Sequence, residues 1–422
     1  MDRLAEFREE IDKCVKCGTC RSVCPVFKVI GREGGSTRGK MTLIGARQEG
    51  KLGLTETYLR AIKDCTLCGA CQTNCPNDVK TTAIIAAARA EAVDELGVPF
   101  TASMVFKNLL GQNSLMDKAF KLATRFQGLM FKSSGSESGL LSRFSTPLVG
   151  KGRLVPQFAK TFFLDMEQVR AAGGEKGLRK TGAPRVAFYA GCGINFLMPE
   201  VGLKSIAVLK RAGAEVIIPP EQVCCGMPAY STGDVESARQ MALRNLEVFE
   251  AYDLDFVATS CATCGYGLKT QLRNLLGGEA ALTERVDAFC SKVRDITELL
   301  TGELKLKGGE NPVGARLATY HDPCHLGRGQ GLREEPRVLI AQSSGVVLKE
   351  MKNPCACCGL GGGLSLSNYE LSTEIARKKA ENIKNSGADV VVTACPGCMV
   401  HLRDGLHRFG VDVKVAHVVE LL

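Results

Sequence analysis

Two cysteine runs with the same spacing constrain this chain more than any other feature of its sequence. The runs are Cys14-x-x-Cys17-x-x-Cys20-x-x-x-Cys24-Pro25 and Cys65-x-x-Cys68-x-x-Cys71-x-x-x-Cys75-Pro76. Thiolates at three-residue steps can surround one metal cluster, while the proline ends the local helix and turns the fourth thiolate elsewhere. Each run is therefore expected to supply three ligands to one [4Fe–4S] cluster and one ligand to another.

This spacing resembles that of the bacterial two-cluster ferredoxins. The resemblance implies one cubane [4Fe–4S] cluster held by Cys14, Cys17, Cys20 and Cys75, and a second held by Cys65, Cys68, Cys71 and Cys24. Zinc is the alternative metal, because C-x-x-C pairs also suit tetrahedral zinc sites. Two complete runs, each followed by proline, favour iron–sulfur clusters over zinc.

The composition and the N-terminal sequence predict a reducing environment for these thiols. The 422 residues include 20 cysteines, 45% hydrophobic residues and 23% charged residues, which is typical of a globular chain with several domains. The start, MDRLAEFREE, is charged, so we expect no secretory signal and a cytoplasmic protein whose clustered cysteines bind metal. No apolar stretch reaches the roughly 18 residues of a membrane span. A peripheral position on the inner face of the cell membrane stays open.

The net charge of +9 is concentrated between Lys118 and Lys180, where the sequence contains twelve Lys/Arg and only four Asp/Glu. A docking surface for an acidic partner or for an anionic membrane face fits this segment. Nucleic acid is not an expected partner, because basic residues are not spread over an element with interleaved aromatic residues.

We expect an α+β multidomain fold with four parts. These are a helical ferredoxin-like domain at residues 1–100, a helical and basic linker region at 101–183, and two tandem α/β domains at 184–304 and 305–422. Thr81–Leu96 is Ala-rich and predicted to be helical. Apolar residues at helical steps between Leu115 and Leu129 predict an amphipathic helix that packs on its own domain, the alternative being a membrane-binding or partner-binding helix. The Ser/Gly content of residues 133–152 predicts a linker.

The last two domains are a tandem repeat. Short apolar runs at 186–190, 215–218 and 256–259 return at 316–320, 346–348 and 390–393, and helix-like sequence separates them. Five cysteines recur at offsets of 132 to 134 residues: Cys192, Cys224, Cys225, Cys261 and Cys264, then Cys324, Cys357, Cys358, Cys395 and Cys398. Buried strands that alternate with helices predict parallel sheets, and the cysteines follow the strands, where α/β proteins place their sites.

Five cysteines per repeat exceed the needs of a cubane, and adjacent cysteines can serve neighbouring irons of an opened cluster. The alternative is that some are buried thiols, as is expected of Cys290 and Cys355. The pattern resembles the cysteine-rich CCG-domain proteins. Over the whole chain it resembles both the D subunit of heterodisulfide reductases and the iron–sulfur subunits of glycolate and D-lactate dehydrogenases. The resemblance implies a non-cubane [4Fe–4S] cluster in each CCG domain, and so four clusters in total.

The details of the resemblance point in two directions. Tyr320-His-Asp-Pro-Cys-His-Leu-Gly-Arg328 resembles the heterodisulfide reductase version, whereas Gly34-Gly-Ser-Thr-Arg-Gly-Lys40 and Cys395-Pro-Gly-Cys-Met-Val-His-Leu-Arg403 resemble the hydroxy-acid dehydrogenase subunits. The favoured hypothesis is an oxidoreductase subunit that passes electrons from a partner FAD subunit, which oxidises D-lactate or glycolate, to a quinone or another carrier. No flavin fingerprint occurs in this chain, so FAD is expected on the partner. The second hypothesis is a catalytic disulfide reductase, and a redox-sensing cluster protein ranks last.

His321 and His325 flank Cys324 and are the candidate catalytic residues. Either could deliver a proton to a sulfur leaving group, or could instead tune the cluster potential by hydrogen bonding. Gly359-Leu-Gly-Gly-Gly363 matches neither a dinucleotide fingerprint nor a P-loop. We expect these glycines to let the backbone approach a cluster and donate N–H groups to its sulfurs.

Overall fold

A computed structural model describes residues 3–111, 131–133, 139–142, 153–172, 182–278, 280–306 and 316–422. The amphipathic helix expected between Leu115 and Leu129 lies outside these residues, as does most of the basic segment. The predicted domain limits at residues 100, 183 and 304 stay predictions.

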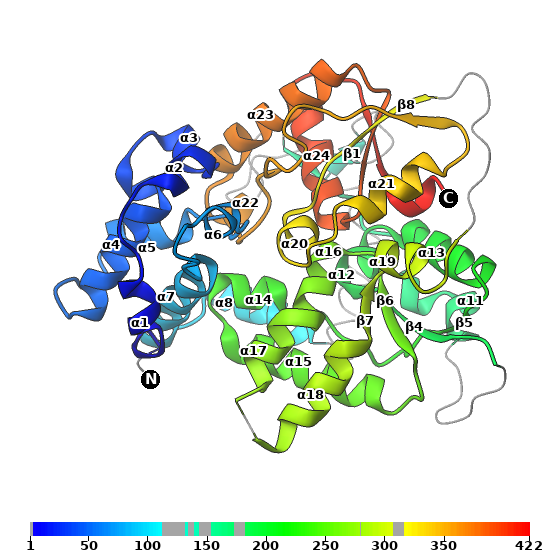
Figure 1. Cartoon of the computed structure of the whole chain (residues 1–422), viewed down its shortest axis with the longest axis horizontal. Helices are drawn as coiled ribbons and strands as arrows, with labels where there is room; N and C mark the ends of the chain where they lie inside the picture. The colour runs from blue at the N-terminus through cyan, green and yellow to red at the C-terminus, as the bar shows by residue number, and fades with distance from the viewer. Residues whose placement is uncertain are drawn as a thin grey trace.

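The N-terminal part is helical, and Figure 1 shows it in blue at one side of the molecule. Its elements are η1 (Ala5–Phe7), α1 (Arg8–Asp12), α2 (Thr19–Val23), α3 (Phe27–Ile30), η2 (Glu33–Gly35), α4 (Thr37–Gln48), α5 (Glu56–Lys63), α6 (Ala70–Thr73), α7 (Thr81–Leu96), α8 (Phe100–Met104) and η3 (Val105–Leu110). The helix predicted for Thr81–Leu96 is confirmed as α7. The core between α4, α5 and α7 is small, with Ile44, Tyr58 and Ile84 fully buried.

The connecting region contains a small antiparallel sheet. Its elements are β1 (Phe131–Ser133), β2 (Leu140–Ser142), β3 (Leu154–Val155), η4 (Phe163–Asp165) and α11 (Glu167–Arg170). The expectation of a linker through residues 133–152 is wrong at β2, which pairs with β1 and β3. The Ser/Gly content on both sides of Leu140–Ser142 concealed this strand, whose partner β3 lies outside the Ser/Gly-rich stretch.

The two repeats fold as four-stranded parallel sheets with helices between the strands. The first contains β4 (Arg185–Tyr189), α12 (Gly191–Phe196), α13 (Pro199–Arg211), β5 (Glu215–Ile217), α14 (Met227–Thr232), α15 (Val235–Glu250), β6 (Phe256–Thr259), α16 (Ala262–Tyr266), η5 (Gly267–Gln271), α17 (Leu272–Leu276), α18 (Ala280–Lys292), β7 (Val293–Asp295) and α19 (Ile296–Thr301). The second contains β8 (Arg316–Tyr320), α20 (Cys324–Gly327), α21 (Glu334–Ala341), β9 (Val346–Leu348), α22 (Leu364–Ser367), α23 (Tyr369–Ser386), β10 (Val390–Thr393), α24 (Pro396–Arg408), β11 (Lys414–His417) and η6 (Val418–Glu420).

The strand order confirms the tandem repeat. It is β5-β4-β6-β7 in the first sheet and β9-β8-β10-β11 in the second, and every pair in both sheets is parallel. The strands predicted from the six apolar runs are present. The central positions of five of them are buried, as is typical of parallel sheets, whereas Val347 at the centre of the edge strand β9 is exposed. Sequence analysis missed β7 and β11, which add the fourth strand to each sheet. The expected α+β fold with two α/β modules is therefore confirmed.

Candidate metal centres

The four cysteines assigned to the first cubane share one small cavity. Cys14, Cys17, Cys20 and Cys75 all line it. The loop that carries the first three passes through left-handed backbone at Lys16 (φ +57°) and Gly18 (φ +88°), which turns its thiols toward a common point. Cys17 is exposed, whereas the other three are half-buried. Four converging thiols fit a [4Fe–4S] cluster, and their roles as ligands stay a prediction.

The cysteines assigned to the second cubane line another cavity, which is Cys24, Cys65, Cys68 and Cys71 together with Pro25 and Lys40. Lys40 is 1% exposed, and its Nζ donates to the carbonyls of Gly34 and Gly35, each at 3.1 Å. Burial lowers the pKa of Lys40, while Cys65 and Cys24 nearby raise it. A buried ammonium group offsets the negative charge that thiolates bring to such a cavity. In the sequence, Lys40 stands out only as the last residue of the Gly34–Lys40 motif, and nothing there indicates that it belongs to this site.

In the first repeat, Cys192, Cys224, Cys225 and Cys264 form one group, and Cys261 contacts this group through Cys264. Cys224 interacts with Cys192 and Cys225, and Cys225 interacts in turn with Cys264. These sulfur contacts raise the pKa of Cys224 and lower that of Cys225. The turn before Cys192 needs Gly191, at φ +64°, because a Cβ there would lie 2.7 Å from the Cys264 sulfur.

The second repeat reproduces this group with Cys324, Cys357, Cys358 and Cys398. Cys357 interacts with Cys324 and Cys358, and the sulfurs of Cys358 and Cys398 are 3.8 Å apart. The Gly359 N–H donates to the Cys357 sulfur at 3.4 Å, so the expected backbone donor to a sulfur is present in the glycine-rich loop. Adjacent cysteines in each repeat thus contact different neighbours, as an opened cluster would require.

The fifth cysteine of each repeat lies where the two repeats meet. The sulfurs of Cys261 and Cys395 are 4.0 Å apart, and the Ala262 N–H donates to the Ala394 carbonyl at 3.1 Å. Sequence analysis assigned these two cysteines to separate clusters and had no means to place them side by side. The two cysteine groups therefore face each other across a short, buried junction.

The second ferredoxin-type group also contacts the second repeat. Cys68 interacts with Cys324 and Cys357. Arg328 spans this contact, because its Nη1 donates to the Cys324 sulfur at 3.3 Å and to the Cys68 carbonyl at 3.4 Å, while its Nη2 donates to the Cys355 carbonyl at 2.6 Å. The surrounding thiols raise the pKa of Arg328 against the effect of burial. A fixed cation therefore stands between two groups that would both be negative when loaded.

The glycine-rich loop has a second role that the sequence did not indicate. A Cβ at Gly362 would collide with the Cys65 carbonyl oxygen, and a Cβ at Gly361 would collide with that of Thr66. These glycines therefore let the loop pack directly on the backbone that carries the second ferredoxin-type group.

Arg89 joins the N-terminal part to both repeats. It is 3% exposed and lies on α7, beside α14. Its guanidinium donates to the carbonyls of Ser231 at 2.5 Å in the first repeat and Gly362 at 2.9 Å in the second. It also donates to the carbonyls of Ile62, Lys63 and Cys65. The only sign of this role in the sequence is that an arginine stands in an otherwise Ala-rich helix, and no prediction was drawn from it.

The two candidate histidines occupy different environments. His321 is fully buried, and one of its ring nitrogens lies within 4.8 Å of the Cys358 and Cys398 sulfurs. His325 stacks on Tyr266 at 4.9 Å between ring centroids and shares a 3.1 Å hydrogen bond with Thr263. It lines a cavity of about 260 Å³ with Cys68, Cys324 and Arg328. Burial lowers the pKa of both imidazoles.

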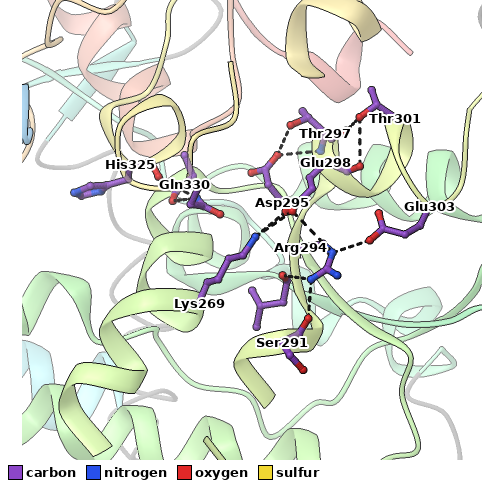
Figure 2. Close-up of polar contacts among 12 residues, drawn as sticks. Lys269, Ser291, Arg294, Asp295, Thr297, Glu298, Thr301, Glu303, His325 and Gln330 are labelled. Atoms are coloured by element: carbon purple, nitrogen blue, oxygen red, sulfur yellow. Dashed lines mark hydrogen bonds and ion pairs between the residues drawn. The ribbon is translucent and has the colours of Figure 1, made fainter. Parts of the chain in front are cut away.

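A polar network supports the junction from the first repeat, as Figure 2 shows. Gln330 donates to the carbonyls of Ala262 and His325, so it ties α16 to the segment after α20. Asp295 caps α19 by accepting from the Thr297 N–H at 2.9 Å, and Lys269 pairs with Glu298. In Figure 2 the His325 ring points away from this network.

Two cysteines, Cys290 and Cys355, lie outside both the ferredoxin-type runs and the repeat pattern. Cys290 is buried and donates to the Leu268 carbonyl at 3.3 Å, as expected of a buried thiol. Cys355 is half-buried, and its carbonyl accepts from Arg328.

None of the helices in the described parts of the chain is long and apolar enough to cross a bilayer.

Two protein families match the chain over the parts that carry the cysteines. The cysteine-rich domain family matches residues 186–269 and 318–403, and the 4Fe-4S dicluster domain family matches residues 10–79. A solved structure of a hypothetical protein from Helicobacter pylori has a TM-score of 0.54 and 9% identity, over 99% of this chain and 74% of that one. At this identity the likeness shows the fold alone.

Several curated relatives are similar over most of the chain. A probable glycolate oxidase iron-sulfur subunit from Bacillus subtilis is 30% identical, over 99% of this chain and 95% of its own length. A fumarate reductase (CoM/CoB) subunit from Methanothermobacter marburgensis is 30% identical, over 97% of this chain and 71% of its own length. Lactate utilization protein A 2 from Bacillus mycoides is 31% identical, over 56% of this chain and 98% of its own length.

Proposed function

This chain belongs to the CCG family of iron–sulfur oxidoreductase subunits, and we propose that it transfers electrons within a flavin-dependent 2-hydroxy-acid dehydrogenase complex. A partner subunit with FAD would oxidise D-lactate or glycolate, and a quinone or another carrier would accept the electrons. The names of the Bacillus subtilis and Bacillus mycoides relatives, which refer to glycolate oxidase and lactate utilization, support this substrate class.

The observation that carries the proposal is the contact between successive cysteine groups. The cavity of the second ferredoxin-type group shares Cys71 with that of the first, Cys68 contacts Cys324 of the second repeat, and Cys261 lies 4.0 Å from Cys395. The clusters, when bound, supply one-electron transfer. The chain's own residues hold the groups close together, bury eight of the ten cysteines of the two repeats, and place Lys40 and Arg328 where they offset negative charge.

A disulfide reductase is the second candidate function, and one specific observation favours it. The cavity of about 260 Å³ reaches Cys68, Cys324 and His325, and Lys80 and Arg328 also line it. A small anionic disulfide could enter this cavity beside two cysteine groups, and His325 could move a proton to the departing sulfur. His321 is buried outside this cavity and is not a candidate for that step.

The test is anaerobic purification of the protein with its native partners, followed by iron and flavin analysis and EPR. Four [4Fe–4S] clusters predict about sixteen irons per chain. A co-purifying flavin subunit and reduction of the clusters by D-lactate or glycolate would support the dehydrogenase. Reduction only by a low-potential donor, with a thiol-linked radical signal when disulfide is added, would support the reductase.

Matched variants test where the iron resides. Cys225→Ser is expected to lose roughly four irons, because it removes a thiol at the centre of the first repeat's group. Cys290→Ser is the control, since this buried thiol lies outside the group, and it should keep the full content. A wild-type content of only about eight irons would contradict the assignment of clusters to the repeats.

A further inference from the structure

The two repeats differ at one position beside their cysteine groups. Three residues before the first cysteine, the first repeat has Tyr189 and the second has His321. Both are fully buried. The Tyr189 hydroxyl donates to the Val223 carbonyl at 2.6 Å, so it is satisfied by protein. The imidazole of His321 is shorter, and neither of its nitrogens makes a hydrogen bond of ordinary geometry, although the Pro354 carbonyl acts on the ring.

The backbone holds His321 firmly in this position. Its N–H donates to the Val392 carbonyl at 2.9 Å, and its carbonyl accepts from the Thr393 hydroxyl at 3.1 Å. The side chain therefore cannot reach solvent through a small loop movement. A buried polar group with no protein partner usually has a water or an ion as its partner.

The atoms that face the imidazole are the sulfurs of Cys358 and Cys398. One nitrogen of His321 and these two sulfurs all lie within 4.8 Å of one another, and the two sulfurs are 3.8 Å apart. Two sulfurs that each lie about 2.3 Å from one tetrahedral metal ion are separated by about 3.8 Å. The sulfur separation thus matches two corners of a tetrahedral site, and the nitrogen of His321 lies within 4.8 Å of both sulfurs.

We propose that His321 is a nitrogen ligand to the iron held between Cys358 and Cys398. The second repeat's cluster then has mixed nitrogen and sulfur ligation, whereas the first repeat, with Tyr189, has only cysteine ligands at this point. The inference rests on the proposed function insofar as that function requires clusters in both repeats.

A nitrogen ligand in only one repeat has a consequence for the reduction potentials of the two clusters, which the repeat would otherwise make alike. The potential of an iron–sulfur cluster depends on the identity and charge of its ligands, and a neutral imidazole that replaces an anionic thiolate raises it. The two repeats' clusters are therefore expected to have different reduction potentials, on either side of the Cys261–Cys395 junction.

Pulsed EPR of the dithionite-reduced wild-type protein tests the ligand directly. The protein is compared after growth with ¹⁵N-histidine and with unlabelled histidine. We expect a strongly coupled nitrogen that changes isotope with the label, as coordination requires. Absence of any strongly coupled nitrogen, or only the weak coupling of a hydrogen-bonded ring, would overturn the proposal. The measurement needs no substrate or partner, so it is independent of whether the hydroxy-acid dehydrogenase assignment fails.

Variants assign the nitrogen to His321. His321→Gln should lose the strong coupling and His325→Gln should retain it. His321→Cys, which restores a ligand, should keep the iron, lose the coupling and lower the midpoint potential of one cluster. If His321→Gln and His321→Cys both lose iron from the second repeat, His321 has a packing role and the proposal fails. It also fails if the coupling disappears in His325→Gln but persists in His321→Gln.

Discussion

Replacing Arg89 by methionine should loosen the N-terminal part from both repeats. Methionine keeps much of the length of arginine and fills the buried space, but it donates no hydrogen bonds. Of the five carbonyls that Arg89 contacts, those of Ser231 and Gly362 belong to the repeats. Only these two hydrogen bonds break when the parts separate, and a hydrogen bond from a charged group contributes about 1.5–3 kcal/mol. We therefore expect the free energy of opening to fall by at least about 3 kcal/mol, which raises the opening equilibrium at least roughly 150-fold.

Native-state amide hydrogen exchange measures this opening, because it resolves the separation of parts of a chain that otherwise stay folded. Faster exchange is expected in α14 and α22, while the central strands β4 and β8 should be unchanged. Arg60→Met is the control, since Arg60 forms only an exposed ion pair with Glu56, and pairs of this kind contribute little. Exchange in α14 and α22 that stays within threefold of the wild type would refute the role given to Arg89.

Three further predictions concern the glycine-rich loop, the cation between two cysteine groups and a buried carboxyl. Gly362→Ala should weaken the same contact much more than Gly410→Ala, because both glycines have similar positive φ but only Gly362 faces a carbonyl oxygen; equal losses of thermal stability would contradict this. Arg328→Gln should slow electron transfer from the second ferredoxin-type group at least several-fold by removing the bridge to Cys324, with unchanged iron content, and an unchanged rate in flash reduction would count against it. Burial raises the pKa of Asp295 to about 7, so the protein should lose stability as pH rises from about 4 through 7, at about 1.4 kcal/mol per pH unit. Between pH 5 and 8, Asp295→Asn should lose roughly 3 kcal/mol less stability than the wild type loses. Urea midpoints that fall with pH by the same amount in both proteins would contradict this.

Much of the fold could be predicted from the sequence because its signals are local. Short runs of buried apolar residues indicate six strands, and the repeat offset of 132 to 134 residues pairs them. β7 and β11 were missed because each is short and carries charged or polar residues among its apolar ones. Their strand character comes from pairing with β6 and β10, which is a long-range interaction.

In the candidate site, too, some features could be predicted from the sequence and others could not. The sequence by itself determined which cysteines belong to each run, because they follow one another at steps that a turn or a short helix can bring together. It determined which belong to each repeat, because they recur at offsets of 132 to 134 residues. It also determined that Tyr189 and His321 occupy equivalent positions.

Only the tertiary structure decided how the groups meet. It placed Cys261 beside Cys395, Cys68 beside Cys324, and the Arg89 guanidinium among carbonyls of all three parts of the chain. The contacts between different parts of the chain join residues separated by more than a hundred positions. Those of Arg89 run to backbone carbonyls, which any residue type supplies. No residue pattern can encode such partners, so the packing of the three parts alone specifies them.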